Sequence, residues 1–206
     1  MKLHTFPPSP NSRKIELVAH TLGLPLEIVA VDLLKGDHRK PDFLALNPNG
    51  KIPVLVDGAK VLWESSAIMI HIAEKKPNAL WPSVAGARID ILRWLFWDAA
   101  QWQPTLGVFL FQNLVKPMLG QGEPDEAVLA FGRENFARYA AVLDGHLTGR
   151  EWIAAEGPTL ADFAIGSALQ YAPQAKIPLE AHGHIGRWFA RLAALPAWGA
   201  TQPKFG

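Results

Sequence analysis

The chain has 206 residues, 49% of them hydrophobic, and its 20 basic and 19 acidic side chains give a net charge of +1. This length allows one large domain or two small ones, and the balanced charge argues against a nucleic-acid partner. The chain contains no cysteine, which excludes disulfides, cysteine nucleophiles and thiolate metal sites. Any thiol chemistry must therefore use a thiol that a ligand brings.

The histidines and the apolar runs of the chain predict neither a metal site nor a membrane protein. The seven histidines are scattered, and His182 and His184 have no third ligand at metal-binding spacing. The first residues lack the apolar core of a signal peptide, and no run of ~18 apolar residues indicates a membrane span. We therefore expect a cytoplasmic protein without a metal and without a membrane partner.

The first 77 residues alternate between strand and helix patterns. The order β-α-β-(α)-β-β-α predicts a compact α/β domain, with a parallel pair of strands followed by an antiparallel hairpin. Gly23 is expected to end the first helix, and Asp57-Gly58 is expected to form the hairpin turn. The expected strands cover residues 2–6, 27–32, 53–57 and 60–63, and the expected helices cover residues 12–22, 39–46 and 65–75.

The pattern changes after a linker at residues 77–82. Strand signals nearly vanish, so we expect a first domain over residues 1–77 and a second, all-helical domain over residues 84–206. Pro104 is expected to break or kink the first long helix, and Thr159 and Asp162 are expected to form a capping box. The expected helices cover residues of about 85–117, 124–147, 159–172 and 184–194.

Segment 47–55, with the sequence NPNGKIPVL, joins a turn to an apolar strand. Its Asn-Gly pair forms the turn, and Lys51 offers a cation for a ligand carboxylate. A cis bond before Pro53 would turn the backbone N–H and C=O of Ile52 toward solvent, where an extended peptide could pair with them. The alternative is that Pro53 only begins an edge strand.

Glu64 and Ser65 stand where a helix is expected to begin. The free N–H groups and the dipole of a helix N-terminus favour an anion. Ser65 adds a hydroxyl and Glu64 can accept from an ammonium group, so the pair suits the amino-acid end of a ligand. The alternative is that both residues are simple caps.

The segment Ser9-Pro10-Asn11-Ser12 precedes the first helix and offers a hydroxyl to a ligand thiolate. The alternative is that Asn11 or Ser12 caps the helix. A free thiol with a pKa of ~8.5 is only ~3% ionised at pH 7, and lowering its pKa to ~6.5 requires ~2.7 kcal/mol. One charge-assisted hydrogen bond together with a helix terminus can supply a stabilisation of this size.

The order and spacing of these motifs resemble those of the cytosolic glutathione S-transferases. The resemblance covers nearly the whole chain, including His38 before a short helix and the Thr-Leu-Ala-Asp-Phe motif at Thr159. It implies a thioredoxin-like α/β N-terminal domain, an all-α helical C-terminal domain and a homodimer. The two tyrosines, Tyr139 and Tyr171, both come late in the chain. The chain therefore resembles the serine-type members, with bacterial, theta-like, phi-like and nu-like features.

The resemblance also assigns roles to individual residues. Ser9 takes the place of the thiol-activating serine, and Asn11 is a second candidate for the sulfur contact through the likeness to nu-type members; Ser12 stays open as a third. The residues expected to hold glutathione are His38 and Lys51 at the glycyl carboxylate, Ile52 before a cis Pro53 at the cysteinyl backbone, and Glu64 and Ser65 at the γ-glutamyl end.

The resemblance implies conjugation of the glutathione thiolate, stabilised by Ser9, to a small apolar electrophile. Trp94, Trp97 and Trp102 are candidates for the electrophile site, although core packing is the alternative for each. Two other functions stay open: glutathione-dependent disulfide reduction that relies on Asn11, and a binding module without turnover. The pattern does not identify the electrophile, because apolar contacts discriminate weakly between substrates.

Overall fold

The computed structural model describes residues 1–203 and divides into two compact units. The first unit contains Met1–Ser83 together with the C-terminal segment from Ala194, and the second contains Val84–Ala193. The sequence analysis placed the C-terminal segment in the helical domain over residues 84–206, so the observed grouping differs at this end. Residues 204–206 lie outside the described residues.

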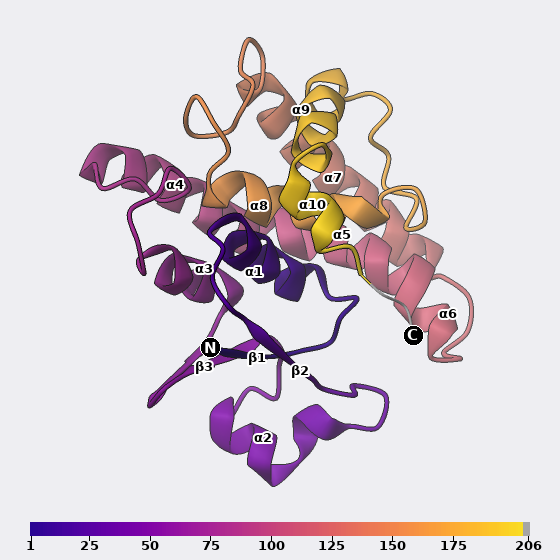
Figure 1. Ribbon diagram of the computed structural model, residues 1–206. Coiled ribbons are helices and arrows are strands. Elements are labelled where there is room, and N and C mark those ends of the chain that lie inside the picture. The colour runs from indigo at the N-terminus through magenta and orange to yellow at the C-terminus, as the bar shows by residue number, and fades with distance from the viewer. Residues whose placement is uncertain (204–206) are drawn as a thin grey trace. The chain divides into compact units, whose positions relative to one another are not determined.

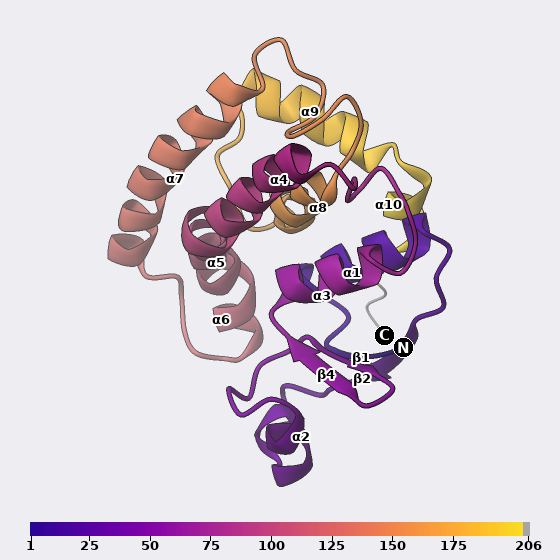
Figure 2. The same cartoon turned by 90° about the vertical axis from the view of Figure 1, so that its left-hand side faces the viewer.

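The first unit is built on a four-stranded sheet with the order β2-β1-β3-β4. β1 pairs with β2 in parallel, whereas the β1–β3 and β3–β4 pairs are antiparallel. Helices α1 and α3 cover one face of this sheet, and α2 lies at the other face (Figures 1 and 2). The strands are β1 (Lys2–Thr5), β2 (Glu27–Ala30), β3 (Val54–Asp57) and β4 (Lys60–Trp63), and the helices are α1 (Pro10–Thr21), η1 (Asp37–Arg39), α2 (Pro41–Leu46) and α3 (Ser65–Ala73).

The expected order of elements in this unit is confirmed, with small shifts at the ends. α1 begins at Pro10, two residues before the expected start, because proline suits the first helical position, where its missing N–H costs nothing. The helix ends before Gly23, whose φ of 62° only glycine adopts freely. Leu3 and Leu55 pair across β1 and β3, and both are fully buried.

An ion-pair cluster fastens the β3–β4 hairpin to α3. Asp57, at the end of β3, accepts hydrogen bonds from His71 Nε2 at 2.8 Å and from Lys75 Nζ at 2.5 Å. Both donors come from α3 or the residues just after it. Asp57 pairs with Lys60 across a two-residue loop that begins at Gly58, as the Asp-Gly signal predicts.

The second unit is helical throughout its regular structure. Its first helical run continues through Pro104 instead of breaking, but it changes to π-helix over Asp98–Trp102, just before that proline. A second π segment, Phe111–Val115, precedes Pro117 in the same way. The wider turns fit the missing N–H and the bulky ring of each proline. The helical elements are α4 (Ala85–Trp97), η2 (Asp98–Trp102), α5 (Gln103–Leu110), η3 (Phe111–Val115), α6 (Lys116–Met118), α7 (Glu126–His146), α8 (Leu160–Gly166), η4 (Ser167–Tyr171) and α9 (Gly183–Ala193).

The capping box expected at Thr159 is confirmed, and it is part of a larger network. The fully buried carboxylate of Asp162 accepts from the backbone N–H of Thr159 at 2.8 Å and from its hydroxyl at 2.9 Å. It also accepts from the N–H of Ile153 at 3.0 Å and from the indole of Trp188 at 2.8 Å. One side chain therefore joins α8 to α9 and to the preceding loop.

Two further observations complete the fold. A short helix, α10 (Pro196–Ala200), follows α9 and packs against α1 within the first unit. The sequence pattern did not predict this helix. Among the described residues, no helix has the combined length and apolar character that a bilayer crossing requires.

Candidate active site

Ser9 lies at the N-cap of α1, with its hydroxyl free of any capping hydrogen bond. Its backbone C=O accepts from the N–H of Ser12 at 3.1 Å and from the N–H of Arg13 at 3.0 Å, which fixes the first turn of the helix. The side chain is half-buried. An unused hydroxyl beside the positive end of a helix is suited to donate a hydrogen bond to an anion.

Burial excludes one of the three candidates that the sequence left open. Ser12 is fully buried, so its hydroxyl does not face a ligand. Asn11 is half-buried, and its Oδ1 accepts from the Ser65 hydroxyl at 3.5 Å. This contact brings the start of α1 and the start of α3 together. Asn11, two residues after Ser9, is therefore in contact with Ser65.

Glu64 is the N-cap of α3 and adopts a strained backbone, with φ of 70° and ψ of 111°. Residues other than glycine seldom hold a positive φ, and such strain collects at functional sites. The exposed carboxylate forms no capping hydrogen bond. The simple-cap alternative therefore does not describe Glu64. The strain is a feature that the sequence analysis missed, and no local sequence signal marks it.

The Ile52–Pro53 peptide bond is cis, as expected. The side chain of Ile52 packs against a small core of Val31, Phe43 and Val54. Within the described part of the chain, the backbone N–H and C=O of Ile52 form no hydrogen bond. Both groups are therefore open to an extended peptide, while the side chain holds the residue in place.

Asn47 shapes the turn that leads to Ile52, and the sequence analysis gave it no role. Its side chain is 2% exposed, and its Nδ2 donates to the carbonyl of Lys51 at 2.7 Å. Its Oδ1 accepts from the N–H of Asn49 at 3.0 Å and from the Asn49 side chain at 2.9 Å. The tendency of asparagine to bond its own backbone two residues on was the signal that could have identified it.

His38 and Lys51 lie on the two sides of Gly50. A Cβ atom added at Gly50 would stand 3.2 Å from the carbonyl oxygen of His38, so the turn packs closely against η1. The Nδ1 atom of His38 is buried and has no hydrogen-bond partner among the described residues. Lys51 is exposed. The turn that carries Lys51 therefore packs against the backbone of His38.

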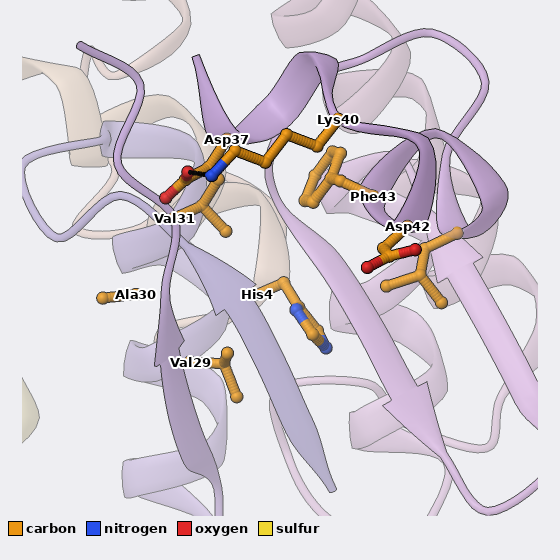
Figure 3. A pocket seen from close by; sticks show the side chains of 9 residues that line it. His4, Val29, Ala30, Val31, Asp37, Lys40, Asp42 and Phe43 are labelled. Carbon is orange, nitrogen blue, oxygen red and sulfur yellow. Dashed lines mark hydrogen bonds and ion pairs between the residues drawn. The ribbon is translucent and has the colours of Figure 1, made fainter. Parts of the chain in front are cut away.

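A hollow of the first unit lies apart from these residues. It has a volume of about 200 Å³ and opens at the sheet face that carries α2, with His4 of β1, Val29 of β2 and Phe43 of α2 around it (Figure 3). Its rim holds the ion pair between Lys40 and Asp37, at 2.6 Å. Burial, helped by the nearby positive charge of Lys2, lowers the pKa of His4. None of the candidate site residues lines this hollow.

The three tryptophans proposed for the electrophile site have different surroundings in the second unit. Trp102 is fully buried, and its indole donates to the carbonyl of Ile165 at 3.1 Å, so it packs in the core instead of lining a ligand site. Trp97 stacks on Trp102 at 5.5 Å between ring centroids and stays half-buried. Trp94 meets Trp97 edge-on at 5.1 Å and is 6% exposed.

The fold and these clustered donors define a two-domain protein of the thioredoxin-like plus helical class. Residues 8–75 match the family model described as glutathione S-transferase, N-terminal domain, and residues 104–196 match glutathione S-transferase, C-terminal domain. The chain therefore belongs to the glutathione S-transferase family, and the expected fold class is confirmed.

Individual relatives agree with the family models over nearly the whole chain. Glutathione S-transferase 3 of Zea mays is 39% identical, over 98% of this chain and 92% of the relative. The solved structure of glutathione S-transferase III in apo form is 38% identical with a TM-score of 0.87, over 100% of this chain and 97% of that one. A structure of glutathione S-transferase-I with bound lactoylglutathione is 30% identical with a TM-score of 0.86, over 97% of both chains.

Proposed function

We propose that this chain is a glutathione transferase in which the Ser9 hydroxyl stabilises the glutathione thiolate. The observation that carries the proposal is that this hydroxyl stands at the N-terminus of α1 with no capping bond, two residues before Asn11, which contacts Ser65. The glutathione conjugate bound to a relative of 30% identity supports glutathione as the co-substrate. The proposal requires no metal, and no group of three or more metal-binding side chains occurs in the described residues.

The first unit also offers contacts to the other parts of the glutathione tripeptide. Glu64 and Ser65 at the start of α3 suit the ammonium and carboxylate of the γ-glutamyl group. Ile52 offers backbone groups to the cysteinyl unit, in the manner of an added strand. His38 and Lys51 offer two donors to the glycyl carboxylate. All of these residues belong to the first unit, so the contacts proposed for glutathione lie within this unit.

The reaction then needs only ionisation and attack. The thiol proton leaves to solvent, and the thiolate sulfur forms a bond to the electrophilic carbon. On an aromatic halide the carbon–halogen bond breaks, and the halide leaves with the bonding electrons. A hydrogen bond from Ser9 together with the helix dipole contributes on the order of 2–3 kcal/mol of anion stabilisation, enough to keep about half or more of the bound thiol ionised at pH 7. No general base is needed.

Trp94 and Trp97 remain our proposed contacts for a flat apolar electrophile. Trp97 keeps part of its surface exposed and lies in a cluster of aromatic rings, which suits an aromatic substrate. Trp102 supports this cluster from the core, where it stacks on Trp97. Its expected direct contact with the electrophile is therefore withdrawn.

Glutathione-dependent disulfide reduction is the second candidate. The contact between Asn11 and Ser65 favours it, because it holds a second polar side chain at the start of α1, two residues after Ser9. In this reaction two glutathiones reduce one disulfide, giving glutathione disulfide and two free thiols. An assay with a hydroxyethyl mixed disulfide separates the two activities. Activity there without conjugation would replace our first proposal, and a binding module without turnover is favoured only if glutathione fails to bind.

We also propose that the chain forms a homodimer. Ile89 and Phe96 lie seven residues apart on one face of α4, and they are 65% and 70% exposed. On β4, Val61 and Trp63 are 40% and 42% exposed. Apolar surfaces of this kind mark association sites, and a second copy of the chain is the partner we propose. Sedimentation of the wild type and of Phe96→Glu tests this; a monomeric wild type would contradict it.

The cytoplasmic location and the bacterial, serine-type and nu-like affiliation stay predictions. The serine-type assignment has the sharpest test, which compares Ser9→Ala with Ser12→Ala. Both variants lose one hydroxyl from the same part of the chain, but Ser12 is fully buried. We expect Ser9→Ala to lower kcat at least ~10-fold toward an aromatic halide, with little change in the Kd for glutathione by calorimetry. Ser12→Ala should retain activity, and a fully active Ser9→Ala would refute the role of Ser9.

A further inference from the structure

A buried arginine follows Ser9 by one helical turn. Arg13 is 1% exposed, and its backbone N–H donates to the carbonyl of Ser9 at 3.0 Å. A guanidinium group can be buried only if other groups replace the water it loses. The groups that hold Arg13 therefore also hold the turn that carries Ser9.

One residue of the C-terminal helix α10 supplies two of these contacts. The backbone carbonyl of Trp198 accepts from Arg13 Nη2 at 2.7 Å, and the guanidinium carbon lies 4.0 Å from the centroid of the Trp198 ring. Trp198 is itself 4% exposed. A hydrogen bond along the guanidinium plane and a ring over its face fix both the place and the tilt of the group.

Hydrogen bonds within the short helix α10 fix the backbone position of Trp198. α10 begins with Pro196 in its first turn, and the N–H of Trp198 donates to the carbonyl of Leu195 at 2.9 Å. At the other end, the Thr201 hydroxyl donates to the carbonyl of Ala197 at 2.8 Å. Ala197 is also buried. These contacts hold the short helix that carries Trp198.

We infer that Trp198 is a positioning residue for the thiolate site: through Arg13 it sets the orientation of the turn that aims the Ser9 hydroxyl. The inference rests on the proposed function of Ser9. The Ser9 hydroxyl makes no capping bond, so its place follows from the backbone of the first turn that carries it. Loss of the Trp198 ring frees one face of the Arg13 guanidinium, and the turn can then shift relative to the bound sulfur.

A double-mutant cycle between Trp198→Ala and Ser9→Ala tests this link. The measurements are kcat, KM for glutathione and the pKa of the bound thiol, followed by thiolate absorbance during a pH titration. We expect Trp198→Ala to lower kcat by about 5–20-fold and to raise the thiol pKa, since small displacements of a catalytic group have effects of this order. In the Ser9→Ala background the same change should alter kcat less than twofold. It should leave the thiol pKa nearly unchanged.

Two controls separate positioning from stability. Trp198→Phe keeps an aromatic face and the backbone carbonyl, so it should restore the thiol pKa and most of kcat. Trp81→Ala removes another buried indole of the first unit, one that is 6% exposed and donates to Glu74 beyond the end of α3, at 2.6 Å. We expect this variant to unfold at lower temperature while its thiol pKa stays at the wild-type value.

The outcomes are distinct. Equal effects of Trp198→Ala in both backgrounds, or an unchanged thiol pKa, would refute the inference and leave the role of Ser9 intact. If Ser9→Ala alone has no effect, the proposed function of Ser9 is wrong and the inference falls with it. If Trp198→Ala does not fold, Arg13→Lys carries the test, because it keeps the charge but loses the planar group. It should raise the thiol pKa in the same way, and an unchanged value would refute the inference.

Discussion

Asn47 holds the turn that presents Lys51 and Ile52, so its replacement by alanine should weaken glutathione binding more than catalysis. The side chain forms one hydrogen bond to the Lys51 carbonyl and two with Asn49. At about 1 kcal/mol for each, the turn loses roughly 2–3 kcal/mol of support. The backbone bond from the Gly50 N–H to the Asn47 carbonyl, at 2.9 Å, remains. If about half of the loss appears in binding, the Kd for glutathione rises ~10-fold.

Calorimetry measures this change directly, and kcat at saturating glutathione should stay within about threefold, since Ser9 is in a different segment. Asn49→Ala is the matched control. Asn49 is exposed, and its backbone N–H still donates to Asn47 after the substitution, so we expect a change in Kd of less than about twofold. An Asn47→Ala protein that binds glutathione as tightly as the wild type would refute the reasoning about this turn.

Three further changes test the fold that supports the site. Hydrogen bonds from Lys75 and His71 lower the pKa of Asp57 to about 2, so its stabilisation is complete above the usual aspartate range and is lost as the pH falls toward 2. After allowance for solvent screening, Asp57→Asn should lower the free energy of unfolding, measured in urea, by about 1 kcal/mol at pH 6 but not at pH 2. Equal losses at the two pH values would contradict the link between the Asp57 pKa and stability. Asp162→Ala leaves four buried donors without an acceptor and should lower the free energy of unfolding by about 3–5 kcal/mol in the same titration. A loss below about 2 kcal/mol would contradict this prediction. Gly166→Ala would put its Cβ 2.1 Å from Leu192 Cδ2 and should destabilise the protein by about 1–2 kcal/mol. A Cβ at Gly107 meets nothing within 4 Å, so Gly107→Ala should stabilise the protein by about 0.5–1 kcal/mol. Similar thermal shifts for the two variants would contradict the close packing at Gly166.

Much of the first unit could be predicted because local chemistry marks its elements. Gly23 ends α1 with a positive φ, and Gly58 opens the hairpin loop in the same way. These are positions where one residue type decides the backbone conformation. The capping box at Thr159 was also predictable, since its two partners are three residues apart. Where a contact joins neighbours in sequence, the residues alone identify it.

The site could be predicted only in part, because burial and backbone strain depend on the whole fold. Ser9 and Ser12 carry the same hydroxyl, and only the full burial of Ser12 separates them. The positive φ of Glu64 comes from its place between β4 and α3, which no local pattern records. Trp102 looked like a ligand contact because aromatic residues in a helix suit both a core and a cleft. Its hydrogen bond to the carbonyl of Ile165, 63 residues away in the sequence, holds it in the core.

The chain order of the first unit has a consequence for its synthesis. The bond between Arg13 and Trp198 spans 185 residues, and the whole second unit is made between its two partners. At about 5–20 residues per second, a ribosome leaves Arg13 without this partner for roughly 10–40 s. The nascent first unit can form its sheet early, but α1 gains its contact with α10 only after α10 emerges. Premature termination near the C-terminus should therefore damage the N-terminal fold, although its sequence is intact.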